Sequence, residues 1–264
     1  ATAAIIRSVG RFGEATASAA RLHEIATLSP AITEALRPVP LPQGADVTFH
    51  DIHFAYPDGT EVLHGVSFSV GAGEHVAITG ISGSGKSTLL SLLLRLEDFR
   101  HGRIEIAGTD IRDVALDELH SRVALLSQHS PVFLDTIRNN LLIAAPDASD
   151  AALWSALRTA RLEDFVRGLP RGLDTLIGET GATLSVGQAR RLCLARTLLS
   201  PADIVVLDEP TSGLDRENEA AFLADIPQAF AGRTLILVTH AELPEEAELR
   251  VLTITNGLIT EEDA

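Results

Sequence analysis

The sequence predicts an α/β fold in which a mainly parallel sheet is covered by helices on both faces. Short apolar runs alternate with helix-like runs along most of the chain, which is the pattern of buried parallel strands. Glycine or polar residues follow the ends of four apolar runs, at Gly80, Gln128, Asp208 and His240. Because ligands bind at the carboxyl ends of parallel strands, we expect these four residues to meet at one edge of the sheet.

Residues 1–44 are predicted to form a helical lead-in followed by an extended linker. Apolar residues recur at intervals of three and four from Ile5 to Ile25, which is the spacing of one helix face. Pro30, Pro38, Pro40 and Pro42 prevent this helix from continuing. A helix that packs on the following domain explains the same periodicity equally well.

An antiparallel hairpin is expected next. Strand-like runs at Asp46–Tyr56 and Glu61–Val70 flank the turn sequence Pro57-Asp58-Gly59. The elements predicted after this hairpin are strands at His75–Thr79, Arg103–Ala107, Val123–Ser127, Ile204–Leu207 and Thr234–Thr239, and helices at Leu89–Leu96, Val186–Leu199 and Glu217–Phe230.

A helical insertion is predicted at about residues 134–182, where helical periodicity appears around Ala151–Ala160 and Leu162–Val166. Trp154 is expected to anchor the core of this insertion rather than to bind a ligand. A second hairpin, Arg250–Thr255 and Leu258–Thr260, is expected near the end of the chain.

The charge balance excludes some classes of function. The chain has 21 Lys and Arg against 36 Asp and Glu, a net charge of −15, which argues against binding nucleic acid or an anionic membrane surface. The single cysteine, Cys193, fits a reducing compartment, and its apolar neighbours predict a buried, unreactive thiol. No run reaches the roughly 18 to 20 apolar residues of a membrane span, so the chain as given is expected to be soluble.

The stretch Gly80–Thr88 fits the pattern G-x-x-x-x-G-K-[ST] of a phosphate-binding loop. Gly80, Gly83 and Gly85 allow backbone N–H groups to point inward at a helix start, where the helix dipole favours an anion. A glycine-rich loop that binds nothing is the alternative, and the order strand, loop, Lys-Ser and helix argues against it. The other residues of the loop that we expect to hold phosphate are Ser82, Ser84, Lys86, Ser87 and Thr88.

Four residues carry the expected phosphoryl-transfer chemistry. Lys86 would sit over the β- and γ-phosphates, and the hydroxyl of Ser87 would reach Mg²⁺. Asp208 and Glu209 follow four apolar strand positions, so Asp208 would hold Mg²⁺ through its water shell while Glu209 orients and polarises the attacking water. Two acids after a strand are usually solvated, and the loop upstream favours the functional interpretation.

The stretch Leu184-Ser185-Val186-Gly187-Gln188 resembles the LSGGQ signature of ATP-binding cassette (ABC) proteins. Other cassette elements fall in the family order: Tyr56 as the A-loop aromatic, Gln128 as the Q-loop, Ser212–Asp215 as the D-loop and His240 as the switch histidine. The resemblance covers roughly residues 46–260. It implies a P-loop NTPase fold of the ABC type, with a nucleotide-binding domain at 45–264 that adds an antiparallel β-subdomain and a helical subdomain, about 134–200, to the core sheet.

The resemblance implies ATP and Mg²⁺ as cofactors. Tyr56 would stack on adenine, Gln128 would contact the metal shell, and His240 would sense the γ-phosphate. Each residue also has an alternative interpretation without a functional role: Tyr56 as an ordinary aromatic residue of a strand, Gln128 as a surface amide and His240 as a loop residue. The implied sets are Lys86, Glu209 and His240 for catalysis, Ser87, Gln128 and Asp208 for the metal, and Ser185, Gly187 and Gln188 for the ATP of a partner subunit.

Further segments resemble ABC exporters in particular. Pro131–Asn140 is similar to the segment that helps to receive the coupling helices of the membrane domain, and Leu169–Thr175 with Gly178-Glu179 is similar to the stretch leading to the X-loop. Residues 1–44 lie where exporters join their last membrane helix to the cassette. The resemblance therefore implies a transmembrane domain fused upstream and a location on the cytoplasmic side of the inner membrane.

Two positions depart from the exporter pattern. Val186 stands where the family has its first signature glycine, and Thr180 stands where exporters often have Arg. A branched side chain at Val186 is expected to weaken the opposite site while the Glu209 site stays complete, so we expect a second nucleotide-binding domain in an asymmetric heterodimer. Segments 184–197, 211–215 and 239–244 are most similar to the cytochrome bd assembly exporter family, whose two-subunit members export cysteine and glutathione.

Two rival classes share part of this motif set. An ABC-type ATPase of DNA repair or chromosome organisation would need long heptad segments and a basic surface, and the sequence shows neither. A non-catalytic, ATP-dependent clamp is disfavoured by the intact Glu209 and His240.

Overall fold

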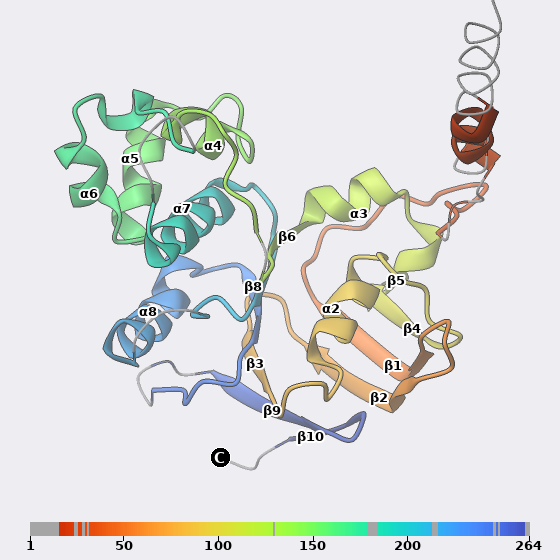
Figure 1. Cartoon of the computed structure of the whole chain (residues 1–264). Helices are drawn as coiled ribbons and strands as arrows, with labels where there is room; N and C mark the ends of the chain where they lie inside the picture. Colours follow the sequence, from red (N-terminus) through yellow and green to blue (C-terminus); the bar gives the residue numbers. More distant parts are fainter. Residues whose placement is uncertain are drawn as a thin grey trace, which may run out of the picture. The chain divides into compact units, whose positions relative to one another are not determined.

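The computed structural model describes residues 16–23, 26, 27, 30, 32–128, 130–178, 184–212, 216–244, 247 and 249–261, without the side chains of residues 217 and 218 (Figure 1). The chain divides into two units, Ala1–Thr33 and Glu34–Ala264. In the first unit residues 16–23 are helical, as the apolar periodicity predicts. The predicted helical positions from Ile5 to Ala15 lie outside the described residues.

Within the described residues, the second unit contains a six-stranded sheet in the order β10-β9-β3-β8-β7-β6 (Figure 1). The strands from β9 to β6 are parallel, and β10 pairs antiparallel with β9. The mainly parallel sheet and the second hairpin are therefore confirmed. The strands are β3 (His75–Thr79), β6 (Val123–Leu126), β7 (Ile204–Asp208), β8 (Thr234–Val238), β9 (Arg250–Thr255) and β10 (Leu258–Glu261).

A four-stranded antiparallel sheet, again counted over the described residues, has the order β2-β1-β4-β5. The predicted hairpin is present, because Ala55 pairs with Glu61 across the turn. The strand expected at Arg103–Ala107 begins two residues earlier and joins this sheet, where it pairs with β1. The strands are β1 (Val47–Ala55), β2 (Glu61–Val70), β4 (His101–Ile106) and β5 (Thr109–Asp110).

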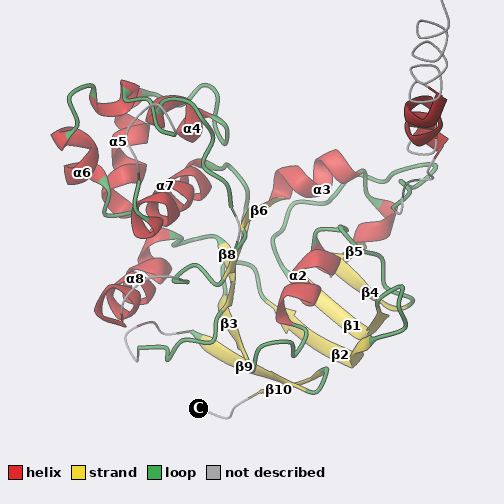
Figure 2. Ribbon diagram, in the orientation of Figure 1, coloured by secondary structure: helices red, strands yellow, loops and turns green. Residues whose placement is uncertain are grey.

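Helices lie on both sides of the parallel sheet. Figure 2 shows α4, α5, α6, α7 and α8 on one side, and α2 between the parallel and the antiparallel sheets. The helices are α2 (Lys86–Leu93), α3 (Leu116–Arg122), α4 (Ile137–Leu142), α5 (Asp150–Thr159), α6 (Glu163–Gly168), α7 (Val186–Leu199) and α8 (Arg216–Ala229), with 3-10 turns at Ile111–Asp113 and Gly172–Asp174.

The side chains of β7 alternate between two hydrophobic cores. Ile204 and Val206 pack with α2 and the antiparallel sheet, whereas Val205 and Leu207 pack with the helical layer. A strand that is buried on both faces needs apolar residues at every position, which explains the continuous run in the sequence. Trp154, the expected core anchor, is only partly buried at the edge of the helical core, where the guanidinium of Arg167 lies 4.2 Å from its ring centroid.

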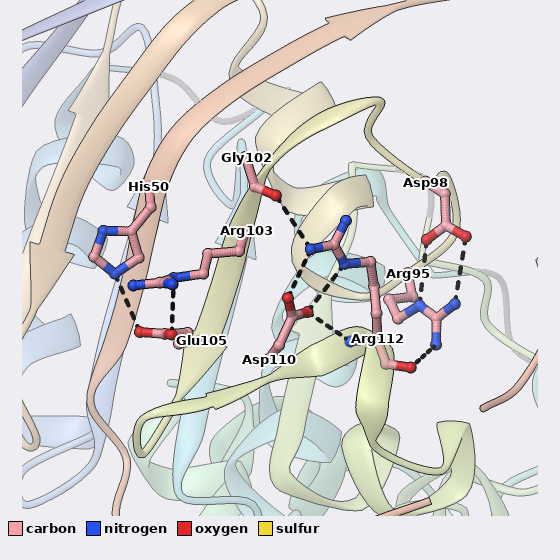
Figure 3. A network of polar contacts seen from close by, with 8 residues as sticks. All are labelled: His50, Arg95, Asp98, Gly102, Arg103, Glu105, Asp110 and Arg112. Carbon is pink, nitrogen blue, oxygen red and sulfur yellow. Dashed lines mark hydrogen bonds and ion pairs between the residues drawn. The ribbon is translucent and has the colours of Figure 1, made fainter. Parts of the chain in front are cut away.

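A polar network joins the end of α2 to β4 and β5 (Figure 3). Arg112 donates to the Asp110 carboxylate at 2.7 Å and to the Gly102 carbonyl at 3.1 Å, and Arg95 pairs with Asp98 at 3.3 Å. The hydrogen bond to Asp110 raises the pKa of Arg112. These charges satisfy one another, so the network holds a surface turn in place. No helix in the described part of the chain has the length and apolar character needed to cross a bilayer.

Candidate active site

A cleft of about 600 Å³ lies where β3, β6, β7 and β8 end. Side chains that follow all four strands meet there, as expected for the carboxyl edge of a parallel sheet. The lining residues are Tyr56, Thr60, Val62, Ser82, Gly83, Gly85, Lys86, Ser87, Thr88, Gln128, Glu209 and His240.

The loop between β3 and α2 requires glycine at two positions. Gly80 has φ +145°, and a Cβ atom there would lie 2.4 Å from the carbonyl oxygen of Ile254. Gly85, the N-cap of α2, has φ +107°, and a Cβ atom there would lie 2.8 Å from Leu63. The backbone therefore packs closely against β9 and β2 while its N–H groups stay at the start of α2.

Lys86 is held at the inner curve of this loop. Its ammonium group is buried and donates to the carbonyl oxygens of Gly80 at 2.7 Å and Ile81 at 2.9 Å. The buried hydroxyl of Ser84 has no hydrogen-bond partner in the described part of the chain. A buried unpaired hydroxyl, a cation and the start of a helix on one loop fit a phosphate group.

Ser87 and Asp208 place two oxygen atoms side by side. The Ser87 hydroxyl donates to Asp208 Oδ1 at 3.3 Å. Burial raises the pKa of the Asp208 carboxyl, and the hydrogen bond from Ser87 offsets part of that effect. Among the described residues no cluster of three or more His, Cys, Asp or Glu side chains could hold a metal ion. A single carboxylate with a hydroxyl fits Mg²⁺, which is usually held by one or two carboxylates together with substrate phosphates.

Glu209 and His240 are in direct contact. His240 Nδ1 lies 2.5 Å from Glu209 Oε2, and the side chains are 66% and 12% exposed respectively. Glu209 has φ +49°, and its backbone N–H donates to the Val238 carbonyl at 2.9 Å. The strained backbone directly after β7 is thus fixed by the neighbouring strand β8.

Tyr56 also lines the cleft. Its hydroxyl is 3.1 Å from Thr88 Oγ1 on α2, and its ring packs edge-on against Phe54 with centroids 5.0 Å apart. An aromatic ring at the edge of a polar cleft can stack on a nucleobase.

The signature residues lie outside this cleft. The Ser185 hydroxyl accepts from the Gln188 N–H at 3.2 Å, and the Gln188 side chain accepts from the Ser185 N–H at 2.9 Å. This capping box begins α7. The structure therefore does not bring Ser185, Gly187 and Gln188 to the phosphate loop, and Val186 is 65% exposed. Thr180, Glu179 and the D-loop residues 213–215 lie outside the described residues.

Arg190 is a functional candidate that the sequence interpretation missed. Its buried guanidinium donates to the carbonyl oxygens of Ser127, at 2.8 Å, and of Gln128. The available signal was a charged residue three positions before Cys193 on a face of α7 that was expected to be buried. Thr60 and Val62, which line the cleft from the first hairpin, were also missed.

A parallel sheet with a phosphate-binding loop after β3, a histidine after the neighbouring strand β8 and an acidic pair at the end of the next strand, β7, define a P-loop ATPase. The family model described as "ABC transporter" matches residues 63–212, more than half of the chain. The chain therefore belongs to the ABC transporter family, as an ATP-binding ATPase domain.

Named relatives agree with this assignment. The chain is 38% identical over 249 residues to the ATP-dependent lipid A-core flippase of Syntrophus aciditrophicus, covering 94% of this chain and 41% of that protein. It is 40% identical over 215 residues to ATP-binding cassette sub-family B member 6 of Rattus norvegicus, covering 81% of this chain and 26% of that protein. A solved structure of a bacterial Atm1-family ABC exporter with ATP bound has a TM-score of 0.84 and 34% identity, covering 94% of this chain and 44% of that chain. The chain thus spans less than half the length of these relatives.

Proposed function

We propose that this chain is the nucleotide-binding domain of an ABC exporter, and that ATP hydrolysis in it powers transport through a transmembrane domain joined upstream. The observation that supports this proposal is the convergence of Lys86, Gln128, Glu209 and His240 on one cleft. Phosphoryl transfer depends on positioning and charge stabilisation more than on covalent chemistry, and these side chains can supply both.

ATP is proposed to bind with its phosphates in the loop between β3 and α2. Lys86 and the unpaired hydroxyl of Ser84 supply donors from the inside of the loop. The first N–H groups of α2 supply others, since they have no partner within the helix. Tyr56, which lines the same cleft, then contacts the adenine.

Mg²⁺ is proposed to be held by Ser87, Asp208 and Gln128. The oxygen atoms of the first two are adjacent, and Gln128 lines the same cleft. Bound Mg²⁺ neutralises phosphate charge during phosphoryl transfer. The buried Asp208 carboxylate is disfavoured by desolvation, so a positive charge beside it is strongly favourable.

Glu209 is proposed to be the general base. His240 Nδ1 fixes Glu209 Oε2, which leaves Oε1 for the attacking water and His240 Nε2 for the γ-phosphate. Glu209 accepts the water proton as the water oxygen bonds to the γ-phosphorus and the bond to the β–γ bridging oxygen breaks. The products are ADP and phosphate.

The partner is proposed to be a second nucleotide-binding domain. The signature residues begin α7 on a surface away from the phosphate loop, so they are positioned to meet another chain. Val186 is exposed on that surface and gives the partner's nucleotide a branched side chain in place of glycine. This difference supports an asymmetric heterodimer.

The membrane domain is proposed to dock on the helical side of the chain, which then lies at the cytoplasmic face of the inner membrane. Phe133, Leu134 and Leu176 are 47%, 73% and 42% exposed there. Thr136 pairs with Leu176, which brings the two segments together. Both belong to or adjoin the stretches that resemble exporters.

The transported substrate is proposed to be cysteine or glutathione, on the resemblance of three short segments. The relatives named above include a lipid A-core flippase, so a lipid is the competing proposal. Transport assays on the full-length pair in vesicles, with labelled cysteine, glutathione and a lipid, decide between them.

Phosphate release from the purified chain at rising protein concentration tests the ATPase proposal. Activity per molecule should rise with concentration, because a complete site needs a second protein surface. No phosphate release at any concentration, alone or with its partner, would favour the non-catalytic clamp. Salt-sensitive binding of duplex DNA would favour the DNA-repair class instead.

A further inference from the structure

We propose that Arg190 is a positioning residue that fixes the Gln128 loop to helix α7, so that contact at the start of α7 alters magnesium binding in the cleft. This inference rests on the proposed function, because it assigns Gln128 to the metal site. Arg190 is two residues beyond the signature residue Gln188, and it is 9% exposed.

The guanidinium of Arg190 forms hydrogen bonds with backbone carbonyl groups. It donates to Ser127 at 2.8 Å and to Gln128, which are 63 and 62 residues away in sequence. A buried guanidinium is always charged and needs several acceptors in a fixed geometry. Two successive carbonyl groups directly after β6 provide them, so the fork of Arg190 sets the direction in which the chain leaves the strand.

Two more side chains on the same face of α7 hold the rest of this segment. Cys193 Sγ donates weakly to the Ser130 carbonyl at 3.5 Å, and Arg196 donates to the Pro131 carbonyl at 3.1 Å. Residues 190, 193 and 196 recur every three positions, which places them along one side of the helix. Residues 127, 128, 130 and 131 are thus held by α7, although none of these four belongs to a strand or a helix.

Helix α7 therefore connects the signature residues with the Gln128 loop. Its first residues carry the signature, and its next turn holds the backbone of Gln128, whose side chain lines the cleft. A small shift of α7 on binding a partner therefore moves Gln128, because packed segments transmit displacement with little compression. A partner that contacts the start of α7 thereby affects the nucleotide site in this chain's own cleft.

The test compares Arg190→Ala with Arg191→Ala. Arg191 is the next residue on α7, and it donates to the Arg161 carbonyl at 3.0 Å. The readouts are the Mg²⁺ concentration for half-maximal ATP turnover, and the affinity for a fluorescent ATP analogue with and without Mg²⁺. The thermal melting temperature reports whether each variant is folded.

For Arg190→Ala we expect the half-maximal Mg²⁺ concentration to rise about tenfold, the size of effect seen when a partner of a metal ligand is removed. Affinity for the analogue without Mg²⁺ should stay within about twofold, since the phosphate loop is untouched. Arg190→Lys, which can donate to both carbonyls with less reach, should lie between Arg190→Ala and the wild type. Arg191→Ala should match the wild type.

Unchanged Mg²⁺ dependence in folded Arg190→Ala would overturn the inference. If that variant does not fold, Arg190→Gln, which keeps one amide donor in a neutral side chain, decides by the same criterion. A wild-type chain that hydrolyses no ATP contradicts the proposed function itself, whereas active wild type with unaffected variants contradicts the role of Arg190 alone.

Discussion

His240 Nδ1 lies 2.5 Å from Glu209 Oε2, although the two residues follow different strands of the parallel sheet. Adjacent strands β7 and β8 run parallel with Asp208 opposite Val238, so the residues that follow them emerge side by side. The pair therefore follows from sheet register. A carboxylate that is fixed at one oxygen keeps the other oxygen directed at the cleft, which is what a general base requires.

Glu209→Gln is expected to reduce ATP turnover by roughly 10²–10⁴-fold, the usual contribution of a general base, and to retain ATP. The amide keeps the shape of the side chain but cannot accept the proton. Phosphate release and binding of a fluorescent ATP analogue measure the two effects. Glu61→Gln, on a side chain that is 74% exposed, is the control and should behave as wild type. Near-normal turnover in Glu209→Gln would show that the base lies elsewhere.

Asp208→Asn is expected to raise the melting temperature at pH 7 in EDTA without nucleotide. Burial raises the pKa of Asp208, so the folded chain binds this proton more tightly than the unfolded chain. The free energy of unfolding then falls as pH rises from the ordinary pKa of Asp, about 3.9, through the folded value, and stays lowered above it.

The stabilisation by Asp208→Asn should therefore shrink as the pH approaches the ordinary pKa of Asp. Melting curves over a pH series measure it. A variant that is less stable than wild type at neutral pH would show that Asp208 is a net stabilising partner of Ser87.

Gly80→Ala is expected to lower the free energy of unfolding by about 2–4 kcal/mol, through backbone strain and overpacking. The new Cβ atom would meet the Ile254 carbonyl at 2.4 Å, and a backbone carbonyl cannot move aside as a side chain does. Gly83→Ala in the same loop is the matched control. Gly83 has φ +80° with nothing within 4 Å, so only the left-handed backbone is penalised, by about 1 kcal/mol. Equal urea midpoints for the two variants would contradict the close packing of the loop against β9.

The parallel sheet and the phosphate loop could be predicted because local patterns determine them. Ile204–Leu207 is apolar at every position, and the loop motif has fixed spacing. Helix α3 was missed because its seven residues show too little of a helical period. The contact of Arg190 with Ser127 could not be predicted, since it joins a side chain to a backbone carbonyl that any residue would offer. The roles assigned to the D-loop and to Thr180 stay predictions.

Cys193 is expected to react with a thiol reagent only after unfolding. The thiol is buried at 2% exposure, and burial raises its pKa although Arg196 and Arg190 lie nearby. Little thiolate forms at neutral pH, and the thiolate is the reactive species. The reaction with a chromogenic thiol reagent, followed by absorbance in buffer and in urea, gives the number of reactive thiols directly, because the chain contains one cysteine. Rapid labelling of the native chain would show that α7 separates from the segment it holds.

Val186→Gly is expected to strengthen ATP-driven self-association of this chain while changing its stability little. Val186 is the first residue of α7 and is 65% exposed, so its removal loses almost no packing, and glycine at a helix end costs at most about 1 kcal/mol. Glycine allows the backbone at the start of α7 to approach a partner's phosphates, which a β-branched side chain obstructs. Sedimentation with ATP, in the Glu209→Gln background to prevent turnover, measures the dimer fraction. If Val186 and Val186→Gly chains dimerise equally, valine does not obstruct the second site, and the proposed asymmetric heterodimer loses its support.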